Sequence, residues 1–170
     1  MLARLKRMLR HRWLDESDAR RAIPPDLLER LAGRVAASEK RHTGEIRIYV
    51  EAGLPTSYLW RDAPARERAV ALFGKLGVWD TEENNGVLIY LLLAEHAIEI
   101  VADRGLTRHV APEQWQAVVA HMGETFRAGR FEEGLTQALE EVSAMLVQHF
   151  PLQSGGPANL NELPDHPVLG

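Results

Sequence analysis

The stretch that decides the fold is TEENNGVLIYLLLAEHAIEIVADRG, residues 81–105. Its segment GVLIYLLLA (residues 86–94) is apolar at odd and even positions alike, which is typical of a central strand covered on both faces. The segment AIEIVA (residues 97–102) alternates apolar and polar residues, and only Glu95 and His96 lie between the two. This short connection predicts an antiparallel hairpin. Glu95-His96 is not a preferred pair for a two-residue turn, so a longer turn is also compatible with the sequence.

An antiparallel hairpin has a consequence for the residues that flank it. The amide-rich loop before the first strand and the pair Asp103-Arg104 after the second strand must come to the same end of the sheet. Residues about 20 positions apart in the sequence therefore become neighbours in space.

The segments around the hairpin predict the rest of the sheet. EIRIYVEA (residues 45–52) has the alternation of a strand, and residues 62–77 carry a helical apolar spacing with a proline in the first turn. A strand–helix–strand unit implies a right-handed parallel crossover. Three further helices are expected. One runs from Pro24 to about His42, one begins at Pro112 and carries apolar residues as far as Phe126, and the last carries apolar residues from Leu135 to Leu146 and ends near residues 149–151, with a tight joint at residues 127–131 between the last two. We therefore predict an α/β fold, in which a small mixed β-sheet with one parallel crossover and one antiparallel hairpin is sandwiched by helices on both faces.

Three regions are expected along the 170 residues. Residues 1–22 form a basic amphipathic N-terminal helix and a linker, residues 23–150 form the α/β domain, and residues 151–170 form a mobile tail. The tail is assigned from its content of proline, glycine, asparagine and serine.

The first region, MLARLKRMLRHRWL, has the pattern of an amphipathic helix. Apolar side chains at three- and four-residue intervals form one stripe, and basic side chains fill the remaining positions. The stripe consists of Leu2, Leu5, Leu9 and Trp13. Such a helix either packs its stripe onto its own domain, or lies on an anionic membrane surface or a membrane-protein partner through residues 1–14.

The amino-acid composition argues against several classes of function. The formal net charge is −4, whereas nucleic-acid-binding proteins are basic, so we expect no nucleic-acid partner. There are no cysteines, which excludes disulfides and thiolate chemistry. No segment has the roughly 20 apolar residues of a membrane-spanning helix, and none has the pattern of a signal peptide. We expect a cytoplasmic protein, with attachment at the periphery of the inner membrane as a further option.

The loop before the hairpin is rich in oxygen ligands of the kind that Ca²⁺ and Mg²⁺ prefer. The predicted metal ligands are Asp80, Glu82, Asn84, Asn85 and Asp103, with Glu83 beside them and Glu45 added if its strand begins at the same end. The spacing does not match an EF-hand, and a solvated polar loop is the alternative.

The pair Asp103-Arg104 has its own chemical interpretation. A guanidinium can clamp an oxyanion with two parallel hydrogen bonds, so Asp103 and Arg104 are candidate catalytic residues of a phosphate-ester hydrolase. A surface ion pair is the competing interpretation. The seven histidines are scattered without a zinc-binding spacing.

Four landmarks in this order resemble the TPM-domain family, which includes thylakoid-lumen acid-phosphatase-like proteins and many bacterial proteins of unknown function. They are Thr43-Gly44 before the first strand, Asn85-Gly86 before the apolar strand, Gly105 after the next strand, and Phe126 with Gly129 between the last helices. The resemblance covers roughly residues 24–150 and implies an α/β sandwich, calcium binding and, in some members, phosphatase activity. The sequence thus predicts a TPM-like binding module for a divalent cation or a partner, with a phosphatase-like hydrolase as the alternative.

Overall fold

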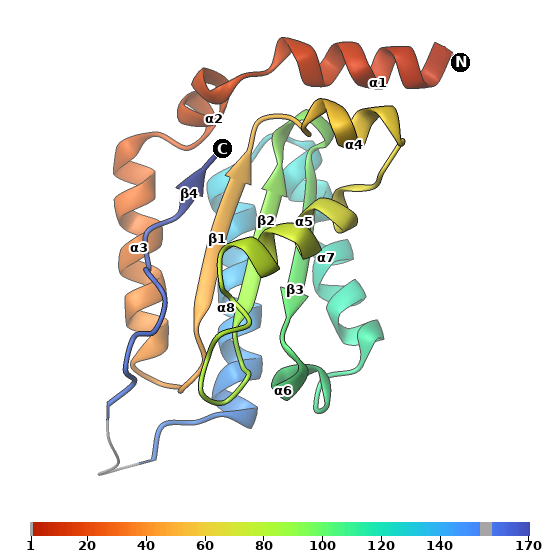
Figure 1. Cartoon of the computed structure of the whole chain (residues 1–170). Coiled ribbons are helices and arrows are strands. Elements are labelled where there is room, and N and C mark those ends of the chain that lie inside the picture. Colours follow the sequence, from red (N-terminus) through yellow and green to blue (C-terminus); the bar gives the residue numbers. More distant parts are fainter. Residues whose placement is uncertain (1, 154–157) are drawn as a thin grey trace.

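The structure, a computed structural model, describes residues 2–153 and 158–170 (Figure 1). The strands are β1 (Ile46–Glu51), β2 (Val87–Leu92), β3 (Ala97–Ala102) and β4 (Val168–Leu169). The helices are α1 (Leu2–Trp13), α2 (Glu16–Ala22), α3 (Pro25–Glu39), α4 (Thr56–Trp60), α5 (Ala65–Lys75), α6 (Arg104–Thr107), α7 (Pro112–Arg127) and α8 (Phe131–His149), with a 3-10 turn η1 (Leu93–Glu95). Among the described residues, no helix has the length and apolar character needed to cross a bilayer.

The four strands form one sheet in the order β3-β2-β1-β4. β1 and β2 are parallel and joined through α4 and α5, whereas β2 and β3 are antiparallel. The predicted mixed sheet is therefore confirmed. The hairpin turn spans residues 93–96, in which η1 is followed by His96 in the left-handed conformation (φ 48°), so the longer of the two expected turns is present.

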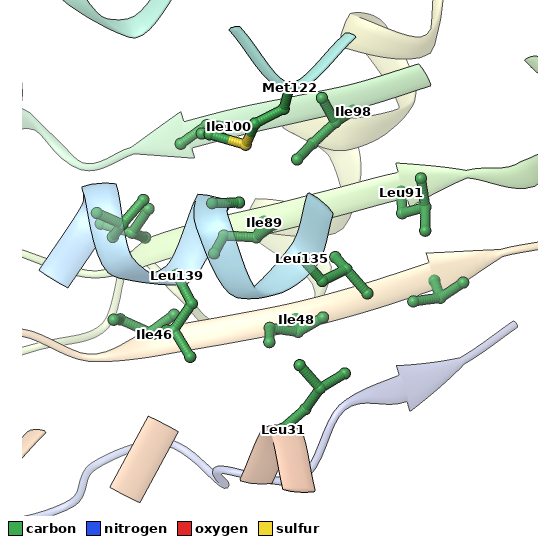
Figure 2. Close-up of a cluster of buried hydrophobic side chains, with 14 of the residues drawn as sticks. Leu31, Ile46, Ile48, Ile89, Leu91, Ile98, Ile100, Met122, Leu135 and Leu139 are labelled. Atoms are coloured by element: carbon green, nitrogen blue, oxygen red, sulfur yellow. The ribbon is translucent and has the colours of Figure 1, made fainter. Parts of the chain in front are cut away.

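Helices cover both faces of this sheet. All six residues of β2 are buried, as predicted for a central strand. α3, α7 and α8 pack over one face and form the larger core, shown in Figure 2, in which Ile48, Ile89 and Ile100 from three neighbouring strands lie beneath Leu135 of α8 and Met122 of α7. α5 covers the other face, over the even-numbered residues of β2.

Two segments differ from the prediction. The supposed linker contains α2, because the Asp15 carboxylate accepts the Ser17 backbone N–H (2.8 Å) and Asp18 accepts that of Asp15 (2.9 Å). These two bonds satisfy the first backbone donors of the helix. Ala19 of α2 is fully buried in the larger core.

The tail predicted to be mobile contributes β4 along the outer edge of β1. The backbone N–H of Gly170 donates to the Val50 carbonyl (2.9 Å), and that of Ala52 donates to the Gly170 carbonyl (3.1 Å). An unpaired edge strand leaves backbone donors and acceptors unsatisfied, and β4 satisfies part of this edge. Composition alone predicted the opposite because it carries no information on which edge is open. Residues 154–157 of the tail lie outside the described residues.

Candidate functional site

The two polar segments that flank the hairpin meet at one end of the sheet. Val87 at the start of β2 is paired with Ala102 at the end of β3. Beyond this pair, the Asp103 N–H donates to the Gly86 carbonyl (2.9 Å), and the Gly105 N–H donates to the Asn84 carbonyl (2.8 Å). The predicted neighbourhood of the loop and the Asp103-Arg104 pair is thus present. We call this region the polar sheet end; it comprises residues 43–45, 80–86 and 103–105.

Two glycines allow the backbones to approach this closely. A Cβ atom on Gly86 would lie 1.9 Å from the Val78 carbonyl oxygen, and one on Gly105 would lie 2.4 Å from the Asn84 carbonyl oxygen. Real Cβ atoms do not approach oxygen so closely, so any side chain would push the segments apart. Both glycines are among the family landmarks named from the sequence.

The Arg104 guanidinium binds the loop before β2 and does not form an ion pair with Asp103. Its Nε and Nη2 donate to Oδ1 of Asn84, at 2.9 and 2.7 Å. Asn84 has a positive φ of 54°, a conformation that asparagine tolerates better than most residues. Arg104 therefore holds a strained turn of the loop, and Asn84 Oδ1 is already engaged as an acceptor.

Asp103 has one engaged and one free oxygen. Oδ1 accepts the Arg104 backbone N–H (2.6 Å) at the start of α6, as an N-cap residue does. Oδ2 is buried and has no hydrogen-bond partner among the described residues. The two proposed catalytic residues are adjacent, but the Asp103 carboxylate already caps α6 and the Arg104 guanidinium already binds the Asn84 side chain.

The predicted metal ligands are not equivalent. Asp80 and Glu82 are exposed. Asn85 is fully buried: its Nδ2 donates to Thr43 Oγ1 (3.1 Å), its backbone N–H donates to Thr81 Oγ1 (3.1 Å), and its Oδ1 has no partner. Within the described residues, no three histidine, aspartate or glutamate side chains are grouped as a metal site requires.

Glu45 also belongs to this end, because its strand begins there: its carbonyl accepts the Val87 N–H (2.8 Å). The side chain is fully buried. Oε2 accepts the Leu163 N–H (3.1 Å), whereas Oε1 has no partner among the described residues. Burial raises the pKa of this carboxyl above its usual range.

A further acidic residue, Glu39, lies next to this site and was not predicted from the sequence. Glu39, the last residue of α3, is buried and accepts the Ile46 N–H through Oε1 (3.0 Å). Burial raises its pKa to about 8, and the nearby charges of Glu45 and Asp165 act in the same direction. The signal was present in the sequence, because Leu31, Val35 and Glu39 are four residues apart and therefore share the buried side of the helix.

Three of the four family landmarks meet here, with Thr43 bonded to Asn85 and with Gly86 and Gly105 at the closest backbone contacts, whereas Phe126 and Gly129 lie at the end of α7. The family model of the TPM domain matches residues 17–145. The chain belongs to the TPM-domain family. This TPM domain is 25% identical to BA42 from the psychrophilic bacterium Bizionia argentinensis; the match to its NMR structure has a TM-score of 0.71 and covers 84% of this chain and 91% of BA42.

A second similar structure is the solution NMR structure of the N-terminal domain of a P. gingivalis protein. It is 21% identical, has a TM-score of 0.61, and the match covers 78% of this chain and 83% of that domain. At this identity, the likeness shows a shared fold alone. No curated protein matches the TPM domain described here.

Proposed function

We propose that this TPM domain is a non-enzymatic binding module whose polar sheet end holds a divalent cation, Ca²⁺ or Mg²⁺. One observation carries the proposal. Glu45, Asn85 and Asp103, which flank three neighbouring strands, each keep one buried side-chain oxygen that has no hydrogen-bond partner among the described residues. Buried acceptors without a donor are costly, and a cation is the ligand that would satisfy oxygen atoms of this kind.

The donor set fits a hard cation in its chemistry. Two carboxylates and one amide carbonyl are ligands that Ca²⁺ and Mg²⁺ accept, usually completed by water. Asp80 and Glu82 lie exposed in the adjoining loop, where they contribute negative charge. Asn84 would join only if its contact with Arg104 opened. This proposal therefore assigns the site to Glu45, Asn85 and Asp103.

The raised pKa of Glu45 adds a pH dependence to the proposal. A cation binds the deprotonated carboxylate, so protons compete with it. Cation affinity should therefore rise with pH and level off once Glu45 is ionised.

Thermal unfolding with and without CaCl₂ or MgCl₂ tests the proposal. A ligand at a hundred times its dissociation constant adds about 2.7 kcal/mol of stability. For a domain of this size, that corresponds to an increase in Tm of roughly 5–10 °C. Glu45→Gln and Asp103→Asn should each reduce the increase.

The matched control is Asp80→Asn, which removes one negative charge from the same loop at an exposed position. It should leave most of the increase intact. The comparison uses the cation-induced change within each variant, so a lower starting stability does not affect it. The absence of any increase with either ion would refute cation binding. An increase lost only in Asp80→Asn would refute the assignment of residues.

A further inference from the structure

α1 packs on the domain through the side that carries Arg4, Arg7, Met8 and His11. The Arg7 guanidinium donates to Glu95 Oε1 (2.7 Å), to Asp62 Oδ1 (2.8 Å) and to the Ala63 carbonyl (2.6 Å). Arg4, one turn earlier, donates to the Trp60 carbonyl (2.9 Å). These bonds attach the helix to the η1 turn and to the α4–α5 connection.

His11 completes this attachment in a buried position. Its Nδ1 accepts the Leu54 N–H (2.9 Å), so Nε2 carries the proton and donates to Glu95 Oε1 (2.9 Å). The helix backbone is also close: a Cβ atom on Gly53 would lie 2.8 Å from the His11 carbonyl oxygen. His11 is 4% exposed, which shows that this side of α1 is an internal contact of the fold.

The apolar stripe consequently faces outward. Leu5 is 54% exposed, Leu9 is 47% exposed and Trp13 is 82% exposed. At 3.6 residues per turn these three side chains follow one line along the helix, nearly opposite His11. Of the two alternatives for α1, the one in which the stripe packs onto its own domain is therefore wrong. The domain contacts the side of the helix that carries Arg7, Met8 and His11, and it leaves the stripe open.

Basic side chains border the open stripe. By the same helical geometry, Lys6 and Arg10 lie on one side of it and Arg12 on the other. All three are exposed, and none of them has an ion-pair partner within residues 2–153 and 158–170. Large apolar side chains flanked by cations are the composition of helices that lie in the surface of an anionic bilayer.

We propose that this face of α1, formed by Leu5, Leu9 and Trp13 with Lys6, Arg10 and Arg12, lies flat on an anionic lipid bilayer. The three cations complement anionic headgroups, whereas they would repel their own copies if two α1 faces met. Tryptophan favours the headgroup region, where its ring is buried and its N–H is hydrated. α1 lies across the end of the molecule opposite α6 (Figure 1), so the polar sheet end would point away from the bilayer.

Co-sedimentation of the full chain with vesicles tests this proposal. Binding is expected to phosphatidylcholine–phosphatidylglycerol vesicles and to weaken at high salt, with much weaker binding to pure phosphatidylcholine. Trp13→Ala should lower the partition coefficient roughly tenfold. Lys6→Gln with Arg10→Gln should lower it about twenty-fivefold, at about fivefold for each charge.

The matched control is Trp79→Ala, because Trp79 is also an exposed tryptophan (54%) but lies in the segment after α5. It should bind vesicles as the unmodified chain does. Equal binding by Trp13→Ala and the unmodified chain would overturn the proposal, as would no binding to anionic vesicles at low salt. Self-association that Trp13→Ala abolishes, without vesicle binding, would overturn it in favour of a second copy of the chain.

Discussion

Glu39→Gln should change how the stability of this TPM domain depends on pH. The glutamine keeps the size of the side chain and the oxygen that accepts the Ile46 N–H, but it cannot ionise. In the native chain, Glu39 has a pKa of about 8, against an ordinary value of 4.5, mainly because it is buried. The folded state therefore binds more protons than the unfolded state between these two pH values.

The sign of the effect follows from this difference in bound protons. The contribution of protonated Glu39 is fully present below pH 4.5 and is lost as the pH rises towards 8. pH 7 lies 2.5 units above 4.5, so at 1.36 kcal/mol per unit the stability lost by pH 7 is about 3 kcal/mol. This is a large share of the 5–15 kcal/mol that stabilises typical proteins.

Urea unfolding of both chains at several pH values between 4.5 and 8.5 provides the measurement. The free energy of unfolding of Glu39→Gln minus that of the native chain should increase by about 3 kcal/mol between pH 4.5 and 7 and by about 4 kcal/mol across the whole range. Glu99 also has a raised pKa, but both chains contain it and it is not coupled to Glu39, so its contribution cancels in the difference. Glu45 is coupled to Glu39 through its charge, so the change in its titration is part of the measured difference. Glu29→Gln, at an exposed position of the same helix, is the control. A difference that does not vary with pH would refute the argument that Glu39 is protonated in the fold.

Three further predictions concern the same end of the sheet. Burial lowers the pKa of His42 to about 4, so the stability that its neutral ring contributes is present above pH 6.5 and falls by about 3 kcal/mol as the pH decreases towards 4. In acid unfolding, the free energy of unfolding of His42→Gln should therefore decrease less steeply with pH than that of the native chain. Gly86→Ala should destabilise the domain by about 3 kcal/mol or more in urea unfolding, because its methyl group would overlap the Val78 carbonyl, and an unchanged midpoint would contradict the close contact. A generic aryl phosphate should not be hydrolysed above background, because Asp103 already caps α6 and Arg104 already binds the Asn84 side chain. Turnover that disappears in Asp103→Asn would instead support the hydrolase hypothesis.

Much of the fold could be predicted because its signals are local. The apolar run of β2, the alternation of β3 and the few residues between them are enough to specify an antiparallel pair. Once that pair is known, geometry alone brings Asn84 close to Arg104. The landmark glycines were equally visible, although the reason for them, a backbone contact with no room for a side chain, became clear only in three dimensions.

The residues of the candidate site could not be predicted from the sequence alone, because their burial depends on contacts between segments that are far apart in the chain. Asp80 and Asn85 are both polar residues of one loop, yet Asp80 is exposed and Asn85 is fully buried with a free oxygen. The tail composition predicted mobility, and the open edge of β1 instead accepted β4. Glu39 is one of several charged residues of α3, and only the packing of the helix shows that its side chain is buried.

The amino-acid sequence by itself determined the order of the elements, the mixed sheet and the amphipathic character of α1, because each of these arises from residue spacing along a short segment. Tertiary structure decided which side of α1 faces the solvent. The stripe of Leu5, Leu9 and Trp13 would ordinarily be buried, but Arg7 and His11 find a carboxylate in Glu95, 84 or more residues away. A partner so distant in sequence leaves no mark in the periodicity of the helix, so only the folded chain shows that the apolar side is left open.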